Sequence, residues 1–118
     1  MPLNKMKAPE VYRLVKQVPR GRVTTYGALA KALKEPGAGR AVGQILKRNP
    51  HPVVVPCHRV VRSDGSLGGY GGNSPPGIKK KIELLKAEGI MVLADKGNFR
   101  VRPFRRFFFD DFKEVCVK

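Results

Sequence analysis

TTYGALAKALKEPGAGRAVGQILKR, residues 24–48, holds two short helical patterns on either side of a chain breaker. Thr24 or Thr25 can cap a first helix that runs to about Lys34, and EPGAG then interrupts it. Residues 38–48 predict a second helix, because their apolar side chains recur at helical spacing and leave the basic ones outside. The expected inward residues are Ala38, Ala41, Val42, Ile45 and Leu46. Two helices joined by a glycine-containing turn indicate a helix-turn-helix, although solvated helical bundles share this pattern.

Short elements are expected on both sides of this unit. Residues 9–18, PEVYRLVKQV, carry apolar side chains at positions i, i+3, i+4 and i+7, which predicts an amphipathic helix. VVV at 53–55 predicts a short buried strand. VVRSDGSLGGY, residues 60–70, predicts a hairpin or a tight loop about Asp64 and Gly65. The intervening PCHR segment is therefore expected between two strands.

The C-terminal part predicts one more helix and a hairpin. GIKKKIELLKAEG, residues 77–89, is expected to be helical, with Gly89 as its stop. Its apolar face is formed by Ile78, Ile82 and Leu85. IMVLADKGNFRV, residues 90–101, predicts a hairpin. The fold class is thus expected to be α+β, a winged helix-turn-helix-like domain over residues 1–102 that is mostly helical with small β-hairpins. The phenylalanine-rich tail, residues 103–118, is expected to pack on the domain or on a partner.

The composition points to an anionic partner. The 118 residues include 24 Lys and Arg against 9 Asp and Glu, a formal net charge of +15 that far exceeds what solubility requires. A membrane surface is the rival to nucleic acid. However, no segment combines a strong apolar face with a basic one, and no apolar run approaches the ~20 residues of a spanning helix. We therefore expect nucleic acid rather than a membrane as the partner.

The N-terminus and the two cysteines fit a cytoplasmic protein. MPLNKMKAPEVY, residues 1–12, lacks the apolar core and the small-residue cleavage site of a secretory signal. Cys57 and Cys116 do not have the spacing of zinc ligands, so no metal site is expected. A disulfide between them stays open by sequence but is disfavoured in a reducing compartment. We therefore expect Cys57 to be a free thiol.

NPHPVVVPCHRVVRSDG, residues 49–65, gathers one cysteine and both histidines of the chain. An imidazole that accepts the thiol proton, directly or through a water, makes a cysteine nucleophilic. Consecutive residues of an extended chain point to opposite faces, so pairing Cys57 with His58 requires a bridging water or a bend, for which Pro56 is suited. The alternative is a buried cysteine without chemistry, since free cysteine is among the most buried residue types. His51 receives no role.

Several motifs in order resemble the catalytic domain of the O6-alkylguanine-DNA alkyltransferases. These motifs are RGRVTTYGALA, RAVGQILKRNPHPVVV, VPCHRVV, and GGYGG followed by LLKAEG. The resemblance runs from about residue 9 to residue 102, and PCHRV is the signature of that family. It implies DNA repair by irreversible transfer of an alkyl group from O6-alkylguanine to the protein's own cysteine, with O4-alkylthymine as an open second substrate. We expect a monomer without cofactor that acts on double-stranded DNA containing alkylated guanine.

The resemblance assigns the reacting groups by position. Cys57 corresponds to the alkyl acceptor, which is consumed by one transfer, and His58 to the base that deprotonates it through a bound water. Glu88 corresponds to the carboxylate that orients this histidine. Tyr26 corresponds to the tyrosine whose hydroxyl donates toward the departing guanine oxygen. Asn49 corresponds to the asparagine that joins the recognition helix to the cysteine segment.

The same resemblance places the DNA contacts. Arg40 corresponds to the arginine that enters the base stack in place of the extruded nucleotide. The guanine pocket is expected to be lined by Pro52, by Tyr70 and by the main chain of Cys57, Val60 and Gly71. Gly71 stands where family members commonly carry a serine, which leaves the tightness of the pocket open. The helix over residues 38–48 is implied to dock in the minor groove through small residues. These are Ala38, Gly39 and Ala41.

Two other functions stay open. An alkyltransferase-like protein would grip the flipped base without transfer and recruit other factors. Such relatives replace the acceptor cysteine, whereas this chain keeps Cys57. A basic DNA-binding regulator without chemistry would share the charge and the helices, and transfer of label from alkylated DNA would distinguish it.

Overall fold

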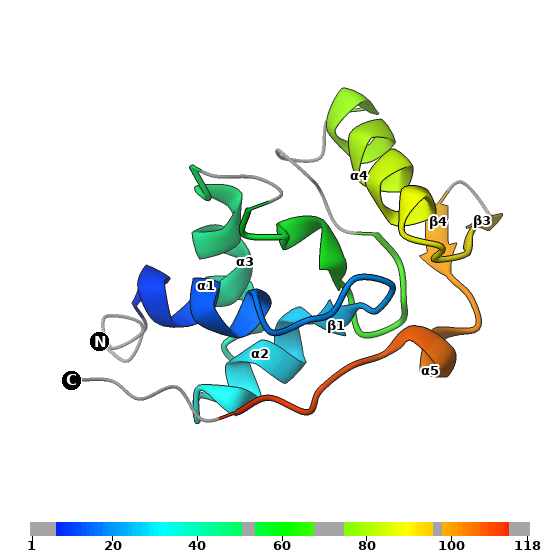
Figure 1. The fold of residues 1–118 in the computed structure, drawn as a ribbon. Helices are drawn as coiled ribbons and strands as arrows, with labels where there is room; N and C mark the ends of the chain where they lie inside the picture. The colour runs from blue at the N-terminus through cyan, green and yellow to red at the C-terminus, as the bar shows by residue number, and fades with distance from the viewer. Residues whose placement is uncertain (1–6, 51–53, 68–74, 96–97, 114–118) are drawn as a thin grey trace.

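The computed structural model describes residues 7–50, 54–67, 75–95 and 98–113 (Figure 1). The helices are α1 (Ala8–Val15), α2 (Tyr26–Ala32), α3 (Gly39–Lys47), the 3-10 helix η2 (Cys57–Arg59), α4 (Pro75–Ala87) and α5 (Phe104–Phe107). The strands are β1 (Thr24–Thr25), β2 (Val60–Val61), β3 (Val92–Asp95) and β4 (Asn98–Val101). Within these ranges, no helix has both the length and the apolar character needed to cross a membrane. The helices and the small two-stranded sheets confirm the predicted α+β class.

The first three helices pack against one another, and α2 and α3 form the predicted helix-turn-helix (Figure 1). α2 begins where it does because Thr25 Oγ1 accepts a hydrogen bond from the Ala28 amide at 3.0 Å. The turn between α2 and α3 contains Lys34 at φ 63° and Gly37 at φ 90°, and the left-handed region suits glycine. The first apolar cluster is formed by Val11, Leu14, Val15, Leu29, Ala30, Val42, Leu46, Val55 and Val60.

β1 and β2 form a parallel pair that the sequence did not predict. The register pairs Thr24 with Val60 and Thr25 with Val61. Strands of two residues are too short to show an alternation of apolar and polar residues, so the sequence carries no pattern that predicts them. After β2 the chain makes a tight loop, in which the Arg62 amide donates to Ser66 O and Gly65 has φ 84°. Ser66 then forms a bridge with Arg100 of β4, so the described part of the predicted segment consists of β2 and a tight loop about Asp64 and Gly65. Residues 68–70 of that segment lie outside the described residues.

The prediction of a buried strand at 53–55 is wrong for its described part. Val54 lies in a turn and is 68% exposed, and Val55 is buried but forms only an isolated bridge. Val53 lies outside the described residues. Pro56 follows directly, and because proline has no amide to donate, it stops a strand ladder from continuing.

The predicted helix over 77–89 and the hairpin over 90–101 are confirmed. α4 is followed by Gly89 at φ 83°, which reverses the chain as expected. β3 and β4 pair as an antiparallel hairpin. Residues of β2, β3, β4 and α4 contribute to the second apolar cluster, formed by Val23, Val61, Leu67, Leu85, Ile90, Val92 and Val101.

Residues 104–113, called here the C-terminal strap, pack along the domain (Figure 1). Val23 donates its amide to Phe107 O and accepts from the Phe109 amide, each at 2.7 Å, which gives a parallel bridge beside β1. Arg22 Nε donates to Phe107 O at 3.1 Å, and its guanidinium lies 5.9 Å from the centroid of the Phe109 ring. The expectation that the tail packs on the domain is therefore confirmed for this part.

Replacing Phe107 by alanine is expected to lower the free energy of unfolding by about 2 kcal/mol, because its half-buried ring packs against the second apolar cluster. The backbone bonds to Val23 do not involve that ring and should remain. Denaturant unfolding of both proteins measures the difference. Arg105→Ala removes an exposed side chain of the same helix and should change stability by less than about 0.5 kcal/mol. Equal changes in the two variants would contradict the role given to the ring.

Candidate active site

Cys57 begins η2 immediately after a bend at Pro56. Pro56 has φ −77° and ψ 66°, the geometry of an inverse γ-turn, and the Cys57 amide donates across it to Val55 O at 2.7 Å. The bend expected at this proline is confirmed. The Cys57 side chain is partly exposed and its sulfur is a free thiol. A substrate can therefore approach a sulfur atom whose backbone is held in place.

His58, the next residue of η2, lies inside the domain. Its side chain is 1% exposed, and its Nε2 is 2.9 Å from Glu88 Oε2 just after α4. Burial lowers the pKa of His58 more than the Glu88 carboxylate raises it, so the imidazole is neutral at neutral pH. Nδ1 is buried and has no hydrogen-bond partner in the described part of the chain. A neutral ring that donates from Nε2 to Glu88 leaves Nδ1 as a proton acceptor.

Arg59, the third residue of η2, completes a clamp on Glu88 that the sequence did not predict. Its Nε donates to Glu88 Oε1 at 2.9 Å and its Nη2 to Oε2 at 2.7 Å, while Nη1 donates to Val18 O at 2.9 Å. Burial by itself would raise the pKa of Glu88, but the hydrogen bonds from Arg59 and His58 lower it overall. The carboxylate is therefore ionised beside the imidazole. The signal was present in the sequence, since Arg59 directly follows the histidine of the PCHRV motif.

Asn49 joins the end of α3 to the nucleophile. Its Nδ2 donates to Val55 O at 3.0 Å and to Cys57 Sγ at 3.5 Å. The first bond fixes the chain just before the bend, and the second brings a polar hydrogen to the sulfur. The hydrogen bond from the Asn49 amide to the main chain of Val55 agrees with the linking role that the resemblance implied.

Tyr26 is the first residue of α2 and lies against α3. A Cβ at Gly39 would come within 3.5 Å of Tyr26 atoms, and one at Gly43 within 3.7 Å of its ring. Burial raises the pKa of Tyr26, the cation of Arg62 opposes this rise, and the charge of Cys57 adds to it. The phenol is therefore protonated at neutral pH and can act as a hydrogen-bond donor.

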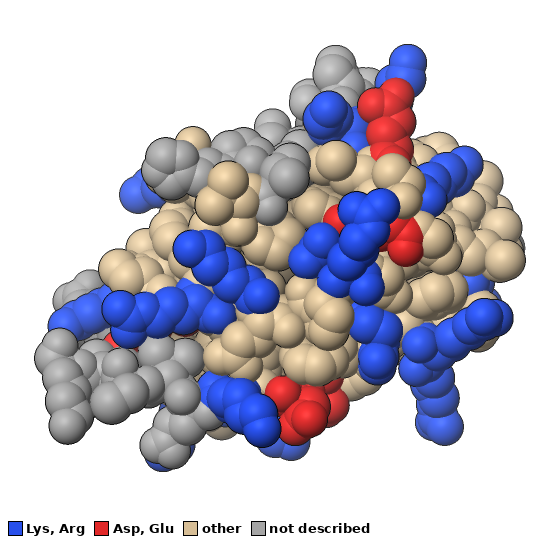
Figure 2. Space-filling model, in the orientation of Figure 1, with Lys and Arg blue, Asp and Glu red and all other residues tan. Residues whose placement is uncertain are grey.

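The outer side of α3 carries exposed basic residues. Arg40 is exposed in its first turn and Lys47 in its last. Two of the small residues implied to approach a DNA groove also contact the domain itself, and their approach to DNA stays a prediction. Ala38 packs against the first apolar cluster, and Gly39 faces Tyr26, because α2 and α3 require close contact there. Figure 2 shows many Lys and Arg side chains and few Asp and Glu on the face that it presents.

Lys81 is a fully buried member of the site that the sequence did not predict. Its Nζ donates to Val60 O at 2.6 Å. Burial lowers the pKa of Lys81 to about 7, although the charge of Cys57 raises it. The helical spacing could have indicated that Lys81 is buried. Lys81 is three positions after Ile78 and four before Leu85, so it lies on the face expected to be apolar.

The structure covers only part of the expected guanine pocket. Outside the described residues lie Pro52, Tyr70 and Gly71, together with His51 and Cys116. Of the main-chain groups expected there, the Val60 amide donates to Cys57 O and closes η2. The Val60 carbonyl accepts from Lys81, and a carbonyl oxygen can still accept a second hydrogen bond.

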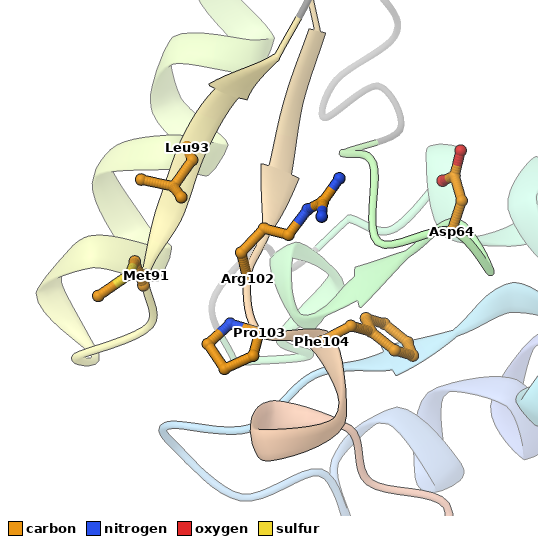
Figure 3. A pocket seen from close by; sticks show the side chains of 6 residues that line it. All are labelled: Asp64, Met91, Leu93, Arg102, Pro103 and Phe104. Atoms are coloured by element: carbon orange, nitrogen blue, oxygen red, sulfur yellow. The ribbon is translucent and has the colours of Figure 1, made fainter.

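A separate groove of about 580 Å³ lies between β3 and the start of α5 (Figure 3). It is lined by Asp64, Met91, Leu93, Arg102, Pro103 and Phe104. None of these side chains belongs to the group around Cys57, so the groove is not the site of thiol chemistry. Among the residues that the structure describes, no three His, Cys, Asp or Glu side chains gather as a metal ion would require.

Residues 7–90 match the family described as 6-O-methylguanine DNA methyltransferase, DNA binding domain. The methylated-DNA--protein-cysteine methyltransferase of Pyrobaculum aerophilum is 43% identical over 101 residues, which cover 86% of this chain and 62% of that protein. S. pombe Atl1 in complex with damaged DNA containing O6-carboxymethylguanine has a TM-score of 0.76 at 28% identity, covering 86% of this chain and 93% of that chain. Mycobacterium tuberculosis OGT in complex with DNA has a TM-score of 0.63 at 41% identity, covering 69% and 48%.

Curated relatives of this kind are longer than the present chain, which spans between 30% and 62% of their length. The matches include the segments that carry the motifs quoted above, and they confirm the resemblance seen in the sequence. The match over residues 7–90 shows that the chain belongs to the 6-O-methylguanine DNA methyltransferase family, through its DNA-binding domain.

Proposed function

We propose that this chain repairs DNA by transferring the alkyl group of O6-alkylguanine directly to Cys57. The observation that carries the proposal is a partly exposed thiol on the same 3-10 helix as a buried, neutral His58 that is held by Glu88. This combines a nucleophile, a base and an orienting carboxylate. Relatives named methylated-DNA--protein-cysteine methyltransferase support the proposal.

The positions of these groups support the following course of the transfer. The thiol proton passes through a water to Nδ1 of His58, and the Glu88 carboxylate stabilises the imidazolium that forms. The thiolate of Cys57 attacks the alkyl carbon, so a C–S bond forms while the C–O6 bond breaks and its electron pair stays on the guanine oxygen. Tyr26 donates its proton to that oxygen, and the proton held by His58 returns to the tyrosine through solvent. The products are guanine and an S-alkylcysteine, and each molecule acts once.

Duplex DNA is the proposed partner. A formal net charge of +15 favours binding to phosphates, and Arg40 is exposed at the start of α3. The alkylated base is hidden in the duplex, so it has to leave the stack before the thiol can reach it, and Arg40 is proposed to occupy the space that it leaves. The similar structures of Atl1 and OGT, both in complex with DNA, support this partner.

A lesion-binding protein without transfer is the alternative that one observation favours. The fold is similar to that of Atl1 with a TM-score of 0.76 and to that of OGT with a TM-score of 0.63. The presence of Cys57 beside the pair of His58 and Glu88 argues for transfer. A protein that only binds the flipped guanine needs neither a thiol nor an imidazole that accepts its proton. A DNA-binding regulator without chemistry would likewise take no alkyl group.

Duplex DNA with radiolabelled O6-methylguanine is expected to transfer at most one equivalent of label to each protein molecule, because the thioether does not revert. Cys57→Ser should abolish this transfer, whereas Cys116→Ser should retain it. Label counting and mass spectrometry of the labelled peptide measure both. Repeated turnover or label on Cys116 would contradict the proposal, and tight lesion binding without transfer would favour the alternative.

Glu88→Gln is expected to lower the transfer rate about 100-fold, because a neutral amide stabilises the imidazolium poorly. The wild-type rate should fall only below about pH 6.5, since burial holds the pKa of His58 under its ordinary value. Glu88 raises the pKa of His58, so the variant should lose its remaining activity at a still lower pH than the wild type. Single-turnover rates measured across this pH range show both effects.

Glu83→Gln, on an exposed residue of α4, is the matched control for this comparison and should transfer like the wild type. If Glu88→Gln transferred as fast as this control, or lost activity at a higher pH than the wild type, the role given to the carboxylate would be wrong.

Arg40→Ala is expected to slow transfer from duplex DNA about tenfold, while reaction with free O6-benzylguanine should be unchanged because no base has to leave a stack. Comparing single-turnover rates for the two substrates measures the difference. Arg105→Ala removes one exposed positive charge elsewhere and controls for the general loss of attraction. A similar loss with both substrates would argue against a role for Arg40 in base extrusion.

A further inference from the structure

The C-terminal strap is attached to the domain at both of its ends. At its start, the rings of Phe104 and Phe107 pack against the second apolar cluster. At its end, the Phe112 ring packs against the first apolar cluster. The Lys113 amide donates to Gln17 Oε1 at 2.7 Å, and Gln17 Nε2 donates to Lys113 O at 3.2 Å. The strap is therefore a fixed neighbour for the segment that lies along its middle.

The middle of the strap contacts the two residues that precede β1. Arg22 donates from Nε to Phe107 O at 3.1 Å and from Nη2 to Phe108 O, and its guanidinium carbon lies 5.9 Å from the centroid of the Phe109 ring. Val23 exchanges main-chain hydrogen bonds with Phe107 and Phe109, each at 2.7 Å. One arginine fork and one pair of main-chain bonds thus hold the entry to β1 against the strap.

β1 lies between the strap and the segment that carries the nucleophile. Its two residues, Thr24 and Thr25, pair with Val60 and Val61 of β2. Val60 also closes η2, because its amide donates to Cys57 O. The order of contacts therefore runs from the strap through β1 and β2 to the 3-10 helix with the thiol.

Tyr26 follows β1 directly, so its position depends on this strand. It is the first residue of α2, and Thr25 is the cap of that helix. The side chains of Tyr26 and Cys57 are both partly buried against the first apolar cluster. Parallel pairs with two residues in each strand contain few hydrogen bonds, and a second neighbour for the segment leading into β1 restricts its movement.

We propose that the C-terminal strap is a positioning element of the transfer reaction: its contacts with Arg22 and Val23 fix β1, and β1 sets the place of the Tyr26 hydroxyl relative to the Cys57 sulfur. The inference rests on the proposed function and deepens it. The strap acts through the tyrosine that donates a proton to the departing guanine oxygen. A displacement of that donor by about 1 Å is enough to slow the reaction about 100-fold.

The first test uses the full chain with Cys116→Ser, called the parent, in which Cys57 is the single cysteine. Arg22→Met removes both side-chain hydrogen bonds to the strap. Two probes react with the thiol without DNA: free O6-benzylguanine, whose leaving oxygen takes a proton, and iodoacetamide, whose iodide takes none. Arg22→Met should react about tenfold more slowly with O6-benzylguanine and at the parent rate with iodoacetamide.

Arg105→Met is the matched control, because it removes an exposed positive charge from the strap itself. It should react like the parent with both probes. Circular dichroism and denaturant unfolding check that the variants fold. If folded Arg22→Met reacted like the parent with O6-benzylguanine, the inference would be overturned. An equal loss with both probes would show a merely structural role and would overturn it as well.

A double-mutant cycle shows whether the effect passes through Tyr26. In the parent with Tyr26→Phe the proton donor is absent, so adding Arg22→Met should slow the reaction with O6-benzylguanine by less than about twofold. A further tenfold loss in this background would mean that Arg22 acts independently of the tyrosine, which would refute the inference.

The second measurement needs no reaction and no Arg22 variant. Phe109→Pro and Phe109→Ala both remove the ring, but only proline also removes the amide that donates to Val23 O. Phe108 has φ −70° and ψ 135°, a conformation that suits the residue before a proline. The ¹³Cζ resonance of Tyr26 is recorded by NMR and assigned through Tyr26→Phe.

This resonance should shift or broaden in Phe109→Pro relative to Phe109→Ala, because the main-chain bond to Val23 is lost only in the former. The resonance of Tyr12, whose hydroxyl donates to Ile45 O, should be the same in the two variants and serves as the internal control. An identical Tyr26 resonance in both variants would contradict the positioning by the strap.

The two measurements separate this inference from the proposed function. If the parent took no alkyl group from DNA or from O6-benzylguanine and the Tyr26 resonance still responded to Phe109→Pro, the proposed function would fail and the control of Tyr26 by the strap would stand. If transfer occurred and neither the rates nor the resonance depended on the strap contacts, the proposed function would stand and this inference would fail.

Discussion

The hydrogen-bonded carboxylate of Glu88 is the constraint on which the rest of the candidate site depends. It accepts from Arg59 and from His58, and so it connects the end of α4 to the 3-10 helix that bears the thiol. Arg59 extends the connection to Val18 O, beyond the end of α1. Buried ion pairs of this kind add little net stability, but losing one partner leaves an uncompensated charge. The clamp on Glu88 therefore mainly fixes the position of the 3-10 helix relative to the end of α4.

Cys57 is held through its backbone neighbours, and its side chain stays partly exposed. Asn49 reaches the carbonyl before the bend, and Lys81 reaches the carbonyl that follows the 3-10 helix. Between these two contacts the γ-turn at Pro56 and the closing bond from Val60 fix the short helix itself. A nucleophile fixed by packing of its own side chain would be buried. Here polar contacts to the main chain add rigidity, while the side chain of Cys57 packs only partly against the first apolar cluster.

Elements with several residues of clear periodicity could be predicted from the sequence, and pairings between distant short segments could not. The helix-turn-helix and the β3–β4 hairpin show their spacing locally, whereas the parallel pair of β1 and β2 joins strands of two residues. For the site, the resemblance named Cys57, His58 and Glu88, and the structure brings the last two into contact. Arg59 and Lys81 were missed because a basic residue in a strongly basic chain looks like part of the solvated surface. Only the fold shows that their charged groups are turned inward.

The bridge between Val23 and Phe108 has a consequence for the order in which the molecule can be completed during synthesis. The helix-turn-helix depends on neighbours in the first part of the chain and can form early, because local contacts close small loops. The partner of Val23 lies 85 residues later in the sequence, at Phe108, so a ribosome must synthesise all of the intervening elements before Val23 is paired. A nascent chain could therefore form its first three helices well before residues 23–25, which precede Tyr26, have hydrogen-bonded neighbours on both sides.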